Sequence, residues 1–415
     1  MNLIRSLKRD IKATVFAPYQ FYKIHSATRD FSVAFSNSLG RPEKSFTDEV
    51  HLVEAMKWLC RAQDSCQGKG VSIKYDIFSG WDPDPYPETT GYILETFLDY
   101  YHYSGDDSFR SRAVRAGDWE IDIQHRSGGV LSSVRNPEKL RVFNTGQVVH
   151  GWCRLFSETG ERRFIEAATR ACDYLIRQQE LDGSWIKDTY DHGPRTYQTR
   201  TAWAMMRVHH LTGNQAYAEA AFKNLDWALA QQQNNGWFKN CGLADANPIT
   251  HVIGYTFRGL LEVALMMEAG TAPLKDDRYL NSVVKGCDGF CDAVEKHPAL
   301  GLRGLAHCSY DSDWKSMENH SCLTGNVQMA GILYKLAKRT GNNRYSRIAD
   351  DLVEITKKTQ NPASMNEGIR GGLAGSYPVH RGYASNLYLN WATKFMADVL
   401  LMRILSRKDC VEKAH

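Results

Sequence analysis

Apolar residues recur at helical spacing along the chain. Ile93, Leu94, Phe97 and Leu98, for example, fall on one face of a helix with about 3.6 residues per turn. No convincing run of Val, Ile and Thr with the alternation of a half-buried strand interrupts this pattern. The pattern therefore predicts an all-α protein.

The predicted helices are of two alternating kinds. Most helices of the first kind, the outer helices, end in a Gln that a Gly follows, as in "QELDGSW" at 179–185 and "QQQNNGW" at 231–237. Helices of the second kind, the inner helices, begin with a polar cluster such as "ETTGY" at 88–92. A short turn such as "LTGNQAY" at 211–217 stops an inner helix and starts the next outer one. The predicted outer helices are 48–63, 108–124, 162–179, 215–232, 277–296 and 343–359.

Twelve helices in six hairpins predict a closed (α/α)6 toroid over residues 45–405. A row of two-helix units cannot bury both of its faces unless the row stacks or closes. In a closed ring the long loops before the inner helices gather at one end, where they form a rim rich in Trp, Tyr, His and Asp. These loops are 64–88, 125–144, 180–198, 233–250, 297–322 and 360–386.

The remaining segments are short. Residues 1–44 are predicted to form a basic arm with a short helix, and residues 406–415 a C-terminal tail. The arm has no secretory core, and no stretch of about 18 apolar residues exists to span a membrane. We therefore expect a cytoplasmic protein, with at most peripheral contact of the arm with the inner membrane.

Composition and charge exclude some classes of function. The net charge is only +4 over 415 residues, with no long basic stripe, so nucleic acid is not an expected partner. The chain has ten Trp and twenty Tyr, a surplus that suits stacking on sugar rings. The ten cysteines have no paired metal-ligand spacing, and Cys60, Cys153, Cys172 and Cys322 are interpreted as small buried hydrophobes.

The layout resembles the six-hairpin glycosidase-like superfamily. The stretches "CLTGNVQMAGILYKLAKRTGNNRYSRIADDLVEITKKTQ", "GIRGGLAGSYPVHRGYASNLYLNWATKFMADVLLM" and "YPETTGYILETFLDYY" look more specifically like VpsJ-type polysaccharide biosynthesis proteins of bacterial exopolysaccharide clusters. The resemblance implies a glycan substrate and exopolysaccharide assembly proteins as partners, but it assigns no catalytic residue.

The stretch "SGWDPDPYPETTGY" at 79–92 is the first candidate for chemistry. Glycoside hydrolysis uses paired carboxylates beside aromatic platforms, and this stretch offers both. Glu88 is the predicted catalytic group. The alternative is that Glu88 only starts a helix and that the two Asp residues form turns. The predicted substrate-binding residues of this stretch are Trp81, Asp82, Asp84, Tyr86 and Tyr92.

The stretch "SYDSDWKSMENHSCLTGN" at 309–326 is the second candidate. Asp313, Glu318 and His320 are predicted to be catalytic, and Trp314 to bind substrate. A pair of Glu88 with Asp313 or Glu318 across the ring would suit hydrolysis. The alternative is a set of loop caps and solvated charges.

Histidine, tyrosine and arginine form a third set. His251 and Tyr255 lie one helical turn apart and could abstract and return a proton at C5 of a uronic acid, whose carboxylate Arg200 or Arg381 would bind. The alternative is a capping His and a core Tyr. Further predicted substrate-binding residues are Asn144, Gln147, Tyr197, Tyr377 and His380.

No metal or cofactor is expected, because His307, His320 and His380 lack the tight spacing of metal ligands.

The sequence therefore favours a carbohydrate-active enzyme on a polysaccharide or oligosaccharide intermediate of exopolysaccharide biosynthesis, by preference a glycoside hydrolase. A uronate lyase or C5-epimerase and a non-catalytic glycan-binding assembly protein remain alternatives. A terpene cyclase or prenyltransferase also has repeated Gln-to-Gly-Trp motifs. The nearest acidic run, "DSDW" at 311–314, lacks the last Asp of an initiating motif.

Overall fold

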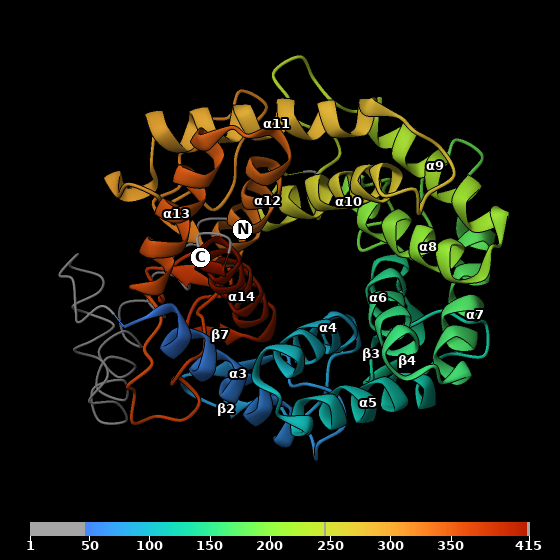
Figure 1. Ribbon diagram of the computed structural model, residues 1–415, viewed down its shortest axis with the longest axis horizontal. Coiled ribbons are helices and arrows are strands. Elements are labelled where there is room, and N and C mark those ends of the chain that lie inside the picture. The colour runs from blue at the N-terminus through green and yellow to red at the C-terminus, as the bar shows by residue number, and fades with distance from the viewer. Residues whose placement is uncertain (1–45, 245, 413–415) are drawn as a thin grey trace, which may run out of the picture.

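The computed structural model describes residues 46–244 and 246–412, with side chains described to residue 407. Twelve α-helices alternate between an inner and an outer ring (Figure 1). The inner helices are α4 (Pro87–Ser104), α6 (Val142–Thr159), α8 (Thr199–Thr212), α10 (Thr250–Glu268), α12 (Leu323–Thr340) and α14 (Asn390–Glu412). The outer helices are α3 (Asp48–Asp64), α5 (Asp107–Asp122), α7 (Arg162–Gln178), α9 (Gln215–Leu229), α11 (Asp277–Lys296) and α13 (Asn343–Lys357).

The two ends of the described chain close the ring. Helix α3 packs against α14, and α14 also contacts α4, so the sixth hairpin is made from the first and last helices (Figure 1). This confirms the predicted (α/α)6 toroid and its outer helices to within three residues at each end. Helix α14 continues to Glu412, so the predicted tail is in part an extension of the last helix. The predicted basic arm at 1–44 lies outside the described residues.

The short turns lie at one end of the ring. Gly105 ends α4 with a φ of 73°, a left-handed conformation that glycine adopts without steric cost. The Asp106 side chain then accepts a hydrogen bond from the Ser108 N–H and caps α5. These local signals explain why the hairpin turns could be predicted from sequence.

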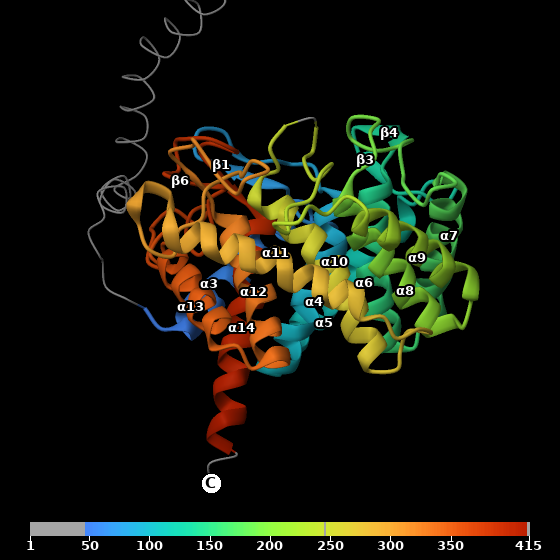
Figure 2. The ribbon, with the colours of Figure 1, turned by 90° about the horizontal axis from the view of Figure 1, so that it is seen from above.

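The long loops gather at the opposite end and contain short strands that the sequence pattern did not predict (Figure 2). All pairings are antiparallel. In the three-stranded sheet, Tyr75 of β1 lies opposite Trp81 of β2 and Tyr388 of β7, which ties the first long loop to the last. The strands are β1 (Lys74–Asp76), β2 (Gly80–Trp81), β3 (Leu131–Ser133), β4 (Asn136–Leu140), β5 (Ser321–Cys322), β6 (Ser376–Tyr377) and β7 (Leu387–Leu389); the sheets are β2-β1-β7, β3-β4 and β5-β6.

The repeated Gln-to-Gly-Trp motif joins the end of one outer helix to the next outer helix. The Gln179 side chain donates to Gly183 O at 3.0 Å and to Ala220 O of the next outer helix at 2.8 Å. Trp185 is fully buried, and its N–H donates to Leu175 O at 2.9 Å. Gln124 and Gln232 make the same pair of contacts in their own repeats. The motif therefore marks the repeated hairpin.

Among the described residues, no helix combines the length and the apolar composition that crossing a bilayer requires.

Candidate functional site

The polar starts of the inner helices face one another at the end of the ring that carries the long loops. Glu88 follows Pro87 in the first turn of α4, where the helix dipole favours a carboxylate. Arg200 lies in the first turn of α8 and His251 in the first turn of α10. Because the inner helices run in the same direction, their first turns lie at the same end of the ring.

Glu88 is held by two tyrosine hydroxyls. The Tyr190 hydroxyl, from the loop before α8, lies 2.6 Å from Glu88 Oε2, and the Tyr86 hydroxyl lies 3.2 Å from the same oxygen. Tyr190 also lies 3.1 Å from Asn144 Oδ1. The Glu88 residue is only 8% exposed. The carboxyl therefore has a defined position and little contact with solvent.

Burial raises the pKa of Glu88 above its ordinary value, although the hydroxyls of Tyr190 and Tyr86 and the charges of His251 and Arg200 act in the opposite direction. Both tyrosine hydroxyls donate to Glu88 Oε2. A buried carboxyl whose pKa is raised is suited to general acid catalysis.

His251 and Tyr255 lie side by side on α10, as the sequence predicted. Their ring centroids are 5.6 Å apart in an edge-to-face arrangement, and the Tyr383 ring lies 5.2 Å from His251 on another side. His251 Nδ1 is 3.4 Å from the Cys322 thiol. Both α10 side chains are buried, and burial together with the Glu88 charge raises the pKa of Tyr255. Tyr255 therefore stays a neutral phenol.

Arg200 is a buried cation without an anionic partner. It is 2% exposed, and among the described residues no carboxylate lies within ion-pair distance of its guanidinium. It donates to Gln147 Oε1 and is surrounded by aromatic rings, with its Cζ 5.4 Å from the ring centroids of both Tyr92 and Tyr255. Arg200 and Phe395 also line an internal cavity. An unpaired buried guanidinium is a costly feature that a bound carboxylate would compensate.

Other predicted binding residues form the walls of this cluster. Tyr92 and Tyr197 are almost completely buried. Asn144 is also buried and uses its amide nitrogen to bind Leu131 O at 3.0 Å, which leaves its oxygen to Tyr190. Gln147 supplies the oxygen that Arg200 contacts. These buried side chains therefore help to position Glu88 and Arg200, and they offer little surface to a ligand.

The acids of the first candidate stretch lie apart from Glu88. Asp82 and Asp84 both form ion pairs with Arg135 on the rim, at 2.9 Å for Asp82. Trp81 packs against Trp58 with ring centroids 4.8 Å apart. These residues tie two rim loops together, and the structure gives them no contact with Glu88.

No contact joins Glu88 to Asp313, which the sequence predicted as a pair. The Asp313 side chain is 70% exposed and lies 3.6 Å from Lys315. Trp314 is buried, and its N–H donates to Asn235 O at 3.0 Å, so it anchors the loop. Asp313 therefore points to solvent on a loop that Trp314 anchors.

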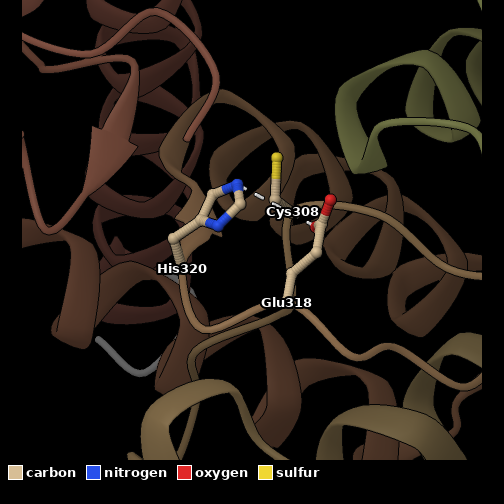
Figure 3. A group of neighbouring side chains, drawn as sticks. All are labelled: Cys308, Glu318 and His320. Atoms are coloured by element: carbon tan, nitrogen blue, oxygen red, sulfur yellow. Dashed lines mark ion pairs between the residues drawn. The ribbon is translucent and has the colours of Figure 1, made fainter. Parts of the chain in front are cut away.

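Glu318 and His320 lie together with Cys308, whose thiol faces them (Figure 3). The glycine-rich stretch places Tyr377 in strand β6, where it is buried, whereas His380 and Arg381 are exposed at its tip.

Sequence reasoning missed three residues of this region. Tyr190 lies in a long loop that contains several aromatic residues, and no local signal distinguishes the one that reaches Glu88. Cys322, interpreted from sequence as a small buried hydrophobe, is buried but contacts His251 at 3.4 Å and caps α12 through the Gly325 N–H. Cys308 was not considered as a site residue. The neighbouring His307 was weighed as a metal ligand only together with other histidines.

No model of a known protein family matches the sequence, and no curated protein matches it. Solved structures do match over most of the chain. An unsaturated glucuronyl hydrolase from Bacillus sp. GL1, described as responsible for the degradation of glycosaminoglycan, is 14% identical with a TM-score of 0.64, over 86% of this chain and 96% of that one. An unsaturated glucuronyl hydrolase specific for heparin is 12% identical with a TM-score of 0.67, over 88% and 99%.

A third match is the cellobiose 2-epimerase of Bacillus thermoamylovorans, which is 10% identical with a TM-score of 0.66, over 86% of this chain and 98% of that chain. At these identities the likeness establishes the fold. The chain is an (α/α)6 toroid of the architecture that these carbohydrate-processing hydrolases and epimerases have.

Proposed function

We propose that this protein is a glycoside hydrolase in which Glu88 is the general acid. The observation that carries the proposal is the buried Glu88 carboxyl, held 2.6 Å from the Tyr190 hydroxyl with a raised pKa. Cleavage of a glycosidic bond requires a proton on the leaving oxygen, and a carboxyl whose pKa is raised by burial is suited to supply it. In this mechanism Glu88 gives its proton to the leaving sugar.

His251 is the proposed base. Both side chains lie in the first turns of inner helices, Glu88 in α4 and His251 in α10, and these first turns lie at the same end of the ring. Most glycoside hydrolases use a second carboxylate to activate water or to attack the sugar. The exposed Asp313 is poorly placed for that role. The His251 imidazole can instead accept the proton of the attacking water, which balances the proton that Glu88 donates.

Arg200 supports an acidic sugar as the substrate. The buried Arg200 guanidinium has no anionic partner among the described residues, and the carboxylate of a uronic acid would supply one. Arginine binds carboxylates through two parallel hydrogen bonds. The solved hydrolases of the same fold are named for glucuronyl substrates, which is compatible with this assignment. The proposed substrate is therefore a polysaccharide or oligosaccharide that contains uronic acid.

A uronate C5-epimerase or lyase is the second candidate, and the grouping of His251, Tyr255 and Arg200 favours it. Binding of the uronate carboxylate by Arg200 would acidify the hydrogen at C5, and His251 could remove it. Return of the proton on the other face gives epimerisation, whereas loss of the substituent at C4 gives a lyase product with a new double bond.

We place the reaction in exopolysaccharide biosynthesis, at a step that trims or edits an oligosaccharide intermediate. The sequence resemblance to exopolysaccharide cluster proteins supports this context. The substrate would then be met in the cytoplasm or at the inner face of the inner membrane, with assembly proteins as partners.

The test is a direct assay on oligosaccharides that contain glucuronic, mannuronic or galacturonic acid. Three products are followed: new reducing ends, the ultraviolet absorbance of unsaturated uronates, and inversion at C5 by proton NMR. Reducing ends without absorbance are expected. Glu88→Gln should lower this rate by about 100-fold or more, while Glu138→Gln, an exposed rim residue, should leave it unchanged.

Each other outcome has a clear meaning. New absorbance or C5 inversion in place of simple cleavage supports the second candidate. Cleavage that continues at the full rate in Glu88→Gln contradicts the assignment of Glu88. Binding of the oligosaccharides without any product returns the protein to the class of non-catalytic glycan-binding proteins.

A further inference from the structure

A cysteine, a glutamate and a histidine converge on the rim beside the proposed active site. The Cys308 thiol, a Glu318 carboxylate oxygen and a His320 ring nitrogen all lie within 4.8 Å of one another (Figure 3). The His320 Nε2 and Glu318 Oε2 atoms are 4.0 Å apart. Ligand atoms around a tetrahedral zinc ion are about 3.5 Å apart, so small side-chain adjustments would close this set around one ion.

Backbone contacts hold the three residues in place. The Cys308 N–H donates to His320 O at 3.1 Å, and Cys308 O accepts from the Thr250 N–H at 2.7 Å. Glu318 O lies 3.0 Å from His307 Nδ1. The loop that carries the three side chains is therefore attached both to itself and to the start of α10, and the donor set does not depend on a free loop.

One oxygen of the set lacks a hydrogen-bond donor, and the histidine ring of the set is restrained. Glu318 Oε2 is buried and has no hydrogen-bond partner. The His320 ring packs so closely on Gly382 that a Cβ there would lie 2.0 Å from its Cδ2, which restrains the ring next to the thiol. A buried carboxylate oxygen without a donor is costly, and a cation is the partner that would satisfy it.

The chemistry of the three side chains indicates which ion the site would bind, and their exposure indicates how the ion would enter. Thiolate, imidazole and carboxylate together suit zinc, whereas magnesium and calcium prefer oxygen ligands alone. Cys308 is 2% exposed, but the side chains of His320 and Glu318 are 14% and 35% exposed, so an ion can enter from the rim. Three protein ligands also leave a fourth position open.

We propose that Cys308, Glu318 and His320 form a zinc site. The ion would cross-link the loop before α12, which continues to Cys322, and the Cys322 thiol lies 3.4 Å from His251. Sequence reasoning did not find this site, because Cys308 lies ten and twelve residues before Glu318 and His320 and the ligands mix three residue types. The proposal is independent of the proposed hydrolase activity.

The test measures metal binding without using activity. The full chain is stripped with a chelator and titrated with Zn²⁺ in competition with a chromophoric chelator. A parallel sample with Co²⁺ is examined for a thiolate-to-cobalt charge-transfer band. One zinc ion per chain and the cobalt band are expected. Cys308→Ser should abolish the band, and Glu318→Gln should weaken zinc binding by about tenfold to a hundredfold.

Matched controls separate ligation from general effects. Cys66→Ser replaces another buried loop cysteine at the same end of the ring, and His380→Asn replaces an exposed histidine of the neighbouring loop; both should bind zinc as the parent chain does. Helical circular dichroism and thermal melting check the fold, and the partly exposed Glu318 provides a test if Cys308→Ser does not fold. Failure to bind zinc, binding that all variants retain, or a cobalt spectrum without a thiolate band would each overturn the proposal.

Discussion

The hydroxyl of Tyr190 lies 2.6 Å from the Glu88 carboxyl, although 102 residues of sequence separate the two side chains. Glu88 belongs to the first turn of an inner helix, and Tyr190 to the long loop that precedes another. This contact positions the proposed general acid and influences its pKa. It is therefore the contact through which the assignment of Glu88 can be examined most directly.

Replacing Tyr190 by Phe should change the pH dependence of the reaction. The Tyr190 hydrogen bond lowers the pKa of Glu88, so its loss should raise that pKa further. The acidic form of Glu88 then persists to higher pH, and the alkaline limb of the profile of kcat/KM against pH should move upward. The maximal rate should fall by about tenfold as the carboxyl loses its orientation. Tyr217→Phe, which removes a hydroxyl bonded to Asp173 between outer helices, is the control and should leave the profile unchanged.

Replacing Glu88 by Gln should change how the stability of the protein depends on pH. The folded-state pKa of Glu88 is raised, so its contribution to stability is fully present below the unfolded pKa and is lost as pH rises through the folded pKa. Gln does not titrate. The free energy of unfolding of the variant relative to the parent should therefore increase from acidic to neutral pH. Urea denaturation across a pH series measures this difference, and a difference that stays constant with pH would show that Glu88 does not titrate in this range.

Replacing Arg200 by Met should separate acidic from neutral substrates. The loss of a charge-assisted contact worth about 1.5–3 kcal/mol should raise KM for a uronate oligosaccharide by about tenfold to a hundredfold. A neutral oligosaccharide that is turned over should show little change in KM. Because Arg200 is buried without an anionic partner, its removal should not lower the free energy of unfolding greatly. Equal effects on acidic and neutral sugars would contradict the proposed role of the guanidinium.

Replacing Gly183 by Ala should cost more stability than replacing Gly105 by Ala. Both glycines have positive φ, 91° and 73°. A Cβ at Gly105 meets no atom within 4 Å, whereas a Cβ at Gly183 would lie 2.3 Å from Lys223 O of the next outer helix. We expect a loss of about 1 kcal/mol for Gly105→Ala from backbone strain and about 2–4 kcal/mol for Gly183→Ala from strain plus collision. Chemical denaturation measures both. Equal losses would show that the packing between these outer helices does not depend on the close approach of Gly183 to Lys223.

Much of the fold follows from local signals. Helical periodicity, glycine stops such as Gly105 and the repeated Gln-to-Gly motif each act within a few residues, so the sequence alone determined twelve helices in a closed ring and their order. It also determined that Glu88, His251 and Arg200 begin inner helices, and the ring then places such starts at one end. The short strands escaped prediction because they are too brief to show a period, and because two of their pairings, β1 with β7 and β5 with β6, join loops distant in sequence.

The detailed site was decided only by the tertiary structure. Asp313 points to solvent on a loop that Trp314 anchors, and Arg135 draws Asp82 and Asp84 to the rim. Tyr190 reaches Glu88, Arg200 is buried without an anionic partner among the described residues, and Cys308 meets His320. These arrangements depend on the paths of the loops, which pairings such as β1 with β7 establish. Sequence periodicity reports which face of an element is buried. The distances across a ring depend on all its elements together, so only the assembled toroid determines which side chains meet.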